Sequence, residues 1–238
     1  MGLKNYMELT TKVVRYNLKI IFAGKFFWFL LAAFAFFAFF MFQQAWNRAE
    51  INEGSIYSLL LFPCLLLIFY PVVFGIQNDE DNRMLEIIFG IPNYRYKVWG
   101  VRMLMIYVAN YFILVLFAYV ARVLLYPVSA FEMAAQLIFP MLFFGNLAFM
   151  FSTVTRSGNA TAVIMIVLGL LFFIFMGGNN QIAYSYWNVF LNPFSIPDNI
   201  HPLIWQNTLF KNRLFLLTGS IVWLLIGLLN LQKRERFV

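Results

Sequence analysis

The chain has 238 residues, of which 63% are hydrophobic and only 11% are charged. Soluble domains carry about a quarter of their residues as charged side chains, so this composition excludes a soluble globular protein. The formal net charge of +7 is compatible with nucleic-acid binding, but the distribution of the basic residues argues against that function.

Cysteine and histidine are too scarce for redox or metal chemistry. The chain contains one cysteine, Cys64, and one histidine, His201. A disulfide within the chain needs two cysteines, and zinc sites usually draw on several Cys and His ligands. We therefore expect Cys64 to be a small buried apolar residue, and we expect no metal site and no catalytic residues.

The first 25 residues carry the pattern of an amphipathic helix. Their charged residues recur at spacings of four or three and form one stripe: Lys4, Glu8, Lys12, Arg15 and Lys19. Apolar residues lie beside this stripe. The pattern predicts a helix over residues 1–25 that lies in the membrane interface.

Six apolar segments follow, and each is long enough to cross a bilayer, which takes about 20 residues. The predicted transmembrane helices span residues 26–46, 55–76, 98–126, 130–155, 160–178 and 213–231. Runs such as FFWFLLAAFAFFAFFMF lack the alternation of a membrane β-strand. The sequence therefore predicts an all-α integral membrane protein with one domain, residues 1–238.

The basic residues predict the orientation of these helices. If the N-terminus lies in the cytoplasm, the outer side receives only Arg48, Arg122, Lys211 and Arg213, and all other Lys and Arg residues are cytoplasmic. Positive charge is enriched in cytoplasmic loops. Both termini are therefore expected in the cytoplasm, and the net charge reflects topology rather than nucleic-acid binding.

The connector between the second and third crossings is rich in acids. It contains Asp79, Glu80, Asp81 and Glu86, out of ten acids in the chain. Carboxylates favour the first turn of a helix, with Asn78 as its N-cap. Leu85, Ile88 and Phe89 would form an apolar side, and Gly90 and Pro92 would end the helix. This pattern predicts a short amphipathic helix over residues 79–89, packed either on the protein's own helices or on another protein.

The same stretch resembles a known family. An acid-rich turn, Leu85-Glu86, two aliphatic residues, Pro92 and a basic residue before a long crossing are similar to the permease subunits of ATP-binding-cassette (ABC) transporters of the type-2 export class. The chain matches that pattern at Glu80, Leu85, Glu86, Ile87, Ile88, Pro92, Arg95 and Gly100. It differs at Arg83 and Met84, where Gly-Thr is usual, and at Val101-Arg102, where the family has Lys.

The resemblance implies a function for the connector. Residues 79–89 would be a coupling helix that seats on a nucleotide-binding subunit. The implied contact residues are Asp79, Glu80, Asp81, Leu85, Glu86, Ile88, Phe89, Pro92 and Arg95. The family's layout also implies a bacterial cytoplasmic membrane, export as the direction of transport, and the fold of type V exporters.

The sequence has no P-loop, because its only Gly-Lys pair, Gly24-Lys25, is followed by Phe26 instead of Ser or Thr. The chain is therefore not expected to be an enzyme or to bind a cofactor by itself. The resemblance implies that ATP and magnesium bind to a separate ATPase subunit present in two copies. It also implies a second permease subunit, either identical or paralogous.

The segment between the last two crossings, residues 179–212, is long and aromatic and contains Pro193, Pro197 and Pro202. One interpretation is an aromatic belt at the membrane interface. The other, which the resemblance implies, is a set of short re-entrant or interfacial helices that cap the exit of a pathway.

Few polar groups lie inside the crossings. The candidates for lining a pathway are Tyr107, Asn110, Tyr111, Gln136 and Asn146. Hydrogen bonding between helices is the alternative role for such residues. The sequence places no acid or base at mid-membrane, which counts against ion-coupled transport. A largely apolar pathway would suit a hydrophobic or amphipathic substrate.

Two other classes of function stay open. A secondary transporter or channel would need no ATPase, and it would give the acid-rich connector no special purpose. An intramembrane enzyme would need a nucleophile and a base at membrane depth. The candidate nucleophile is Ser220, and His201 lies in the outer segment with no sign of being its partner. Ser220 lacks the Gly-x-Ser-x-Gly context of a nucleophile elbow.

Overall fold

The computed structural model describes residues 25–46, 51–81, 83–84, 94–177, 184–197 and 200–231. Every element in these ranges is helical, which confirms the predicted all-α class. The elements are α2 (Phe26–Trp46), α3 (Glu53–Val73), α4 (Gly75–Asp81), the π-helical turn η1 (Arg95–Gly100), α6 (Val101–Leu124), α7 (Ala130–Thr155), α8 (Gly158–Gly177) and α10 (Pro202–Asn230). The amphipathic helix predicted over residues 1–25 lies, apart from Lys25, outside the described residues.

Six helical spans are long and apolar enough to cross a membrane, as predicted. They are α2, α3 continued by α4, the end of η1 continued by α6, α7, α8 and α10. Large apolar side chains such as Phe112 and Phe173 are more than half exposed on these spans. Such surfaces are stable against lipid and not against water, so the chain is a multi-pass membrane protein.

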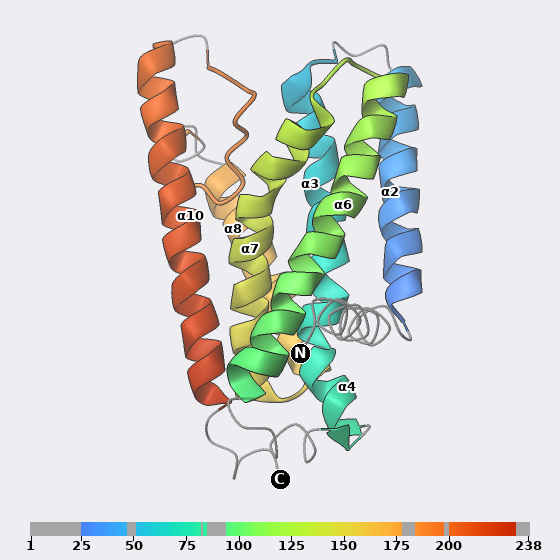
Figure 1. Ribbon diagram of the computed structural model, residues 1–238. Coiled ribbons are helices and arrows are strands. Elements are labelled where there is room, and N and C mark those ends of the chain that lie inside the picture. The colour runs from blue at the N-terminus through green and yellow to red at the C-terminus, as the bar shows by residue number, and fades with distance from the viewer. Residues whose placement is uncertain are drawn as a thin grey trace, which may run out of the picture.

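Helix α7 lies at the centre of the bundle, where it packs against α3, α6, α8 and α10. In Figure 1, α2 and α10 lie on opposite sides, with α3, α6 and α7 between them. Most of α7 is buried, whereas α8 and α2 are largely exposed. Stacking of Phe37 on Phe117, 5.1 Å between ring centroids, joins α2 to α6.

Glycine allows α10 to approach α7 closely. A Cβ atom on Gly219 would lie 2.8 Å from the Phe143 ring, and one on Gly227 would lie 2.7 Å from the Phe149 ring. Both distances are too short for carbon atoms, so any larger residue would push the two helices apart. In membrane proteins generally, small residues at helix–helix contacts let the two backbones approach closely.

Successive long helices run in opposite directions, so the segments that connect them lie at one or the other end of the bundle (Figure 1). We call the connector end the one that carries α4, η1 and the last turn of α10. The outer-segment end carries the start of α3, residues 184–197 and the start of α10. Helices α7 and α8 meet at the connector end through a two-residue link, Arg156-Ser157, in which Arg156 adopts a left-handed φ of 57°.

Helix α10 begins well before Arg213, where the sequence placed the start of the last crossing. The His201 side chain accepts a hydrogen bond from the Leu203 amide at the start of this helix, and Pro202 occupies its first turn. Proline suits this position because its missing N–H would be unsatisfied anyway. The last part of the predicted 179–212 segment is therefore helical.

Candidate functional site

The first three acids of the connector lie in the last turn of one helix and not in the first turn of a new one. Asn78, Asp79, Glu80 and Asp81 lie at the end of α4, which continues α3 after a break at Phe74. The predicted role of these acids as the N-terminal cap of a new helix is therefore wrong. The hydrogen bond from the Asn78 amide N–H to the Phe74 carbonyl bridges the break and lets the helical path continue.

Asp79 forms a buried ion pair with Arg102 of α6. The Arg102 Nη1 atom lies 2.6 Å from the Asp79 Oδ2 atom, and the side chains of Arg102 and Asp79 are only 6% and 7% exposed, respectively. A carboxylate at the carboxyl end of a helix is unfavourable because the helix dipole is negative there. The guanidinium of Arg102 compensates for that position, and it also lies 4.6 Å from the centre of the Trp99 ring.

This ion pair connects the two sides of the connector. Asp79 precedes residues 82–93 and Arg102 follows them, so α4 and α6 are fixed to each other where the chain leaves one and returns to the other. The Tyr94 hydroxyl also donates a hydrogen bond to the Leu231 carbonyl just after α10. The connector end therefore links three helices through buried polar contacts.

Further hydrogen bonds hold α4 to its neighbours. The Gln77 side chain accepts a hydrogen bond of 2.7 Å from the Gly158 amide at the start of α8. The Tyr70 hydroxyl accepts hydrogen bonds of 3.3 Å from the Asn78 side chain and from the Lys25 amide. Through these bonds and the ion pair, a displacement of α4 would change its contacts with α6 and α8. It would also affect Tyr70, which bonds to the Lys25 amide just before α2.

The other two acids of α4 take no part in the ion pair between Asp79 and Arg102. Glu80 and Asp81 are exposed, as is Arg83 just beyond them. Arg83 has a φ of 54°, a conformation that glycine adopts at no steric cost. Leu85, Glu86, Ile88, Phe89 and Pro92 lie outside the described residues. Arg95 begins η1, and its side chain is not described.

Three of the five polar residues proposed for a pathway take part in two separate groups of hydrogen bonds. The Tyr107 hydroxyl donates to Asn146 Oδ1, Asn146 Nδ2 donates to Ser220 Oγ (both 2.6 Å), and Ser220 Oγ donates to the Leu142 carbonyl at 3.2 Å. This Tyr107–Asn146–Ser220 chain joins α6, α7 and α10. Gln136 belongs to the second group, near the outer-segment end. Asn110 is buried on α6, and Tyr111 is partly buried.

Arg213 was expected at the edge of the membrane, but it lies within α10 and is buried. Its Nε atom donates to Gln136 Oε1 of α7 at 3.0 Å, and its Nη1 atom donates to Asn212 Oδ1 at 3.1 Å. Asn212 Nδ2 in turn donates to the carbonyls of Tyr186 and Asn188 at 2.9 and 2.8 Å. These bonds satisfy non-helical backbone that would otherwise be costly to bury.

The outer segment is tied to α3 as well. The Asn192 side chain donates to the Gly54 carbonyl at 2.8 Å and to Ser58 Oγ at 3.1 Å. Trp205 Nε1 donates to the Pro193 carbonyl at 3.3 Å. Sequence reasoning missed this role of Asn192 and Asn212, because nothing in their spacing indicates which carbonyls they meet.

The fold and these two polar ends define a multi-pass helical membrane protein. Comparisons with protein families, with curated proteins and with solved structures find no match.

Proposed function

We propose that the chain is the membrane-spanning permease subunit of an ABC transporter. It exports a hydrophobic or amphipathic substrate across a bacterial cytoplasmic membrane, with both termini in the cytoplasm. Two copies of a separate ATPase subunit bind ATP and magnesium, and a second permease subunit completes the pathway.

The observation that carries this proposal is the ion pair between Asp79 and Arg102 across the connector. An element that receives force from an ATPase must pass it to more than one transmembrane helix. The pair joins the last turn of α4 to the start of α6, so a displacement of the connector moves both helices together. An isolated pair of this kind gives little net stability, so a role in specifying a geometry accounts for it better.

A second observation supports the resemblance on which the proposal rests. Arg83 stands where the family usually has glycine, and its φ of 54° is the conformation that glycine favours. The backbone at this position therefore has a conformation that glycine, the family's usual residue, adopts at no steric cost. Exposed Glu80 and Asp81 lie beside it and are available to basic groups of a partner.

The first test is purification of the tagged chain from native membranes in mild detergent, with mass spectrometry of what accompanies it. We expect a stoichiometric P-loop ATPase that is lost in the Glu86→Arg variant. The matched control is Glu132→Arg, because Glu132 is exposed in the first turn of α7 at the opposite end of the bundle.

The control variant should keep the ATPase, and both variants should insert into the membrane. Recovery of the chain alone in several detergents, with transport driven by an ion gradient, would contradict the proposal and favour the secondary transporter or channel. Normal ATP-dependent transport by Glu86→Arg would contradict the assigned coupling role.

A further inference from the structure

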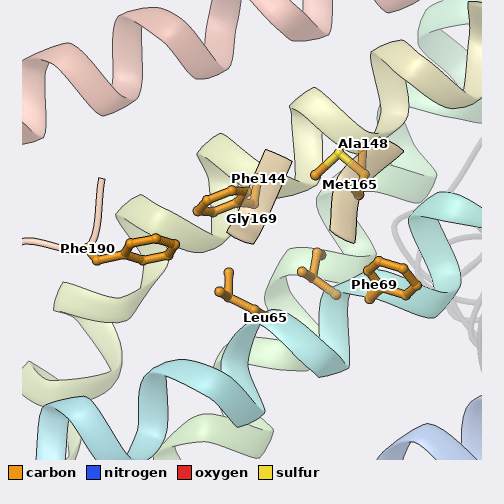
Figure 2. Close-up of a pocket in the computed structure, with 8 residues that line it drawn as sticks. Leu65, Phe69, Phe144, Ala148, Met165, Gly169 and Phe190 are labelled. Carbon is orange, nitrogen blue, oxygen red and sulfur yellow. The ribbon is translucent and has the colours of Figure 1, made fainter. Parts of the chain in front are cut away.

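A narrow apolar slot lies between α3, α7 and α8 (Figure 2). It has a volume of about 100 Å³, and every side chain that lines it is apolar. Helix α8 makes few contacts with the rest of the bundle and is mostly exposed, so this slot is where its packing against α3 and α7 is incomplete.

The slot spans about one helical turn of both α3 and α7. Leu65 and Phe69 of α3 line it one helical turn apart, as do Phe144 and Ala148 of α7. Each pair is separated by about 6 Å along its helix. Figure 2 places Leu65 with Phe144 and Gly169 towards one end of the slot, and Phe69 with Met165 towards the other.

The two ends of the slot differ. Phe190 of the outer segment stacks on Phe144, with 5.4 Å between ring centroids, and both rings line the end that faces the outer segment. On α8, Gly169 leaves open space, because no atom lies within 4 Å of where its Cβ atom would be. A side chain at this position would occupy the slot.

Size and chemistry decide what the slot can hold. A helix has a diameter of about 10 Å with its side chains, which is too wide for this space. A lipid head group would find no hydrogen-bond partner among the apolar lining residues. An alkyl chain is slender and apolar and runs parallel to transmembrane helices, and such chains surround α8 on its exposed side.

We propose that the slot binds one acyl chain of a membrane phospholipid, with the chain end against Phe144 and Phe190. The chain supplies the contacts that α8 lacks with α3 and α7, and it acts through dispersion because hydrocarbon surrounds the protein anyway. This inference does not depend on the ATPase or on transport.

The test uses the full chain in nanodiscs that contain a phosphatidylglycerol with a diazirine near the end of one acyl chain. After irradiation, mass spectrometry compares labelling of peptides that line the slot, around Phe69 and Met165, with labelling of the lipid-exposed face of α6 around Val108 and Phe112. This ratio corrects for non-specific contact with the bilayer.

We expect the ratio to exceed one in the natural chain and to fall to one in Gly169→Leu, because the leucine side chain would take up space that the acyl chain otherwise occupies. The matched control is Ala160→Leu, which adds the same side chain at an exposed position of α8 outside the slot. This variant should keep the ratio of the natural chain.

The Phe69→Ala variant widens the slot and should raise the ratio, so the proposal is tested in both directions even if Gly169→Leu folds poorly. An unchanged ratio in Gly169→Leu and Phe69→Ala would overturn the proposal. Slot peptides that stay unlabelled while the exposed face of α6 is labelled would overturn it as well.

Discussion

The two ends of the bundle are stabilised by different chemistry. At the connector end, a buried carboxylate and a buried guanidinium form an ion pair between α4 and α6. At the outer-segment end, neutral amides of Asn192 and Asn212 bond to backbone carbonyls of a non-helical segment and of α3. One end has two opposite charges in a fixed geometry. The other has non-helical backbone whose carbonyls accept from amides, and its buried Arg213 guanidinium is bonded to the neutral side chains of Gln136 and Asn212.

The difference follows from the backbone structure at each end. A segment without helical hydrogen bonds can be buried only if other groups satisfy its carbonyls, and amide side chains do this without the desolvation cost of a full charge. A buried ion pair is a poor source of stability, but it selects one relative position of two helices. The proposed function accordingly assigns the transmission of motion to the connector end, where one relative position of two helices is selected.

The largest effect should come from breaking the ion pair. The Arg102→Met variant leaves the Asp79 carboxylate buried without a partner, and the expected loss of stability is about 3–5 kcal/mol. The measurement is the thermal unfolding midpoint in detergent micelles. Arg122→Met is the matched control, because Arg122 lies on the same helix but is exposed, and it should leave the midpoint unchanged.

The double exchange Asp79→Arg with Arg102→Asp separates attraction from side-chain shape at the same site. It should recover part of the loss, because opposite charges again face each other. A midpoint for Arg102→Met equal to that of the natural chain would show that the ion pair does not hold α4 and α6 together.

At the outer-segment end, Asn212→Leu removes the donor to two carbonyls and the acceptor of the Arg213 bond, while keeping the number of side-chain heavy atoms. The expected loss is about 1–3 kcal/mol, the usual cost of leaving buried polar groups unsatisfied. Asn207→Leu on an exposed position of the same helix is the control and should have no such effect. If both variants unfold at the same temperature, the outer segment is not held by Asn212.

In the middle of the bundle, Asn146→Leu breaks the Tyr107–Asn146–Ser220 chain of hydrogen bonds. Such bonds between membrane helices contribute about 0.6 kcal/mol on average, and the variant loses two, so the expected loss is about 1 kcal/mol. Asn159→Leu, at an exposed position of α8, serves as the reference. If Asn146→Leu loses as much stability as Arg102→Met, the hydrogen bonds in the middle of the bundle matter as much as the ion pair at the connector end.

The smallest effect is expected at Arg83, and its sign is opposite. Arg83→Gly removes the strain of a left-handed residue but adds freedom to the unfolded chain, so stability should rise by only about 0.5 kcal/mol. Arg83→Val should lower it, because a β-branched residue tolerates this backbone conformation least. Unfolding midpoints that rank valine above glycine would contradict the φ of 54° found here.

The length of the hydrophobic runs predicts the number of crossings well, because a helix needs about 20 apolar residues to span the hydrocarbon core. It fails at α10, whose first half contains Gln206, Asn207, Lys211, Asn212 and Arg213 and therefore does not read as apolar. The start of this helix was nevertheless signalled by Pro202, a residue favoured in the first turn. Polar residues that face neighbouring helices and a neighbouring segment escape any measure based on hydropathy alone.

The candidate site was predictable only in part. The acids at Asp79, Glu80 and Asp81 were found from composition, but their placement at the end of α4 depends on a one-residue break at Phe74 after which the helix resumes. The partner of Asp79 lies 23 residues away on α6, and only the packing of two helices brings them together. For the same reason, the sequence could not separate the chain through Asn146 from the cluster at Gln136.

The two-residue link between α7 and α8 has a consequence for how the protein is made. A link of two residues keeps the end of α7 and the start of α8 close together, so we expect the two helices to enter the bilayer as a hairpin. Helix α7 carries Gln136 and Asn146, whereas α8 carries no charged side chain and few polar ones. Insertion of the more polar α7 would therefore be favoured by the apolar α8 that follows it.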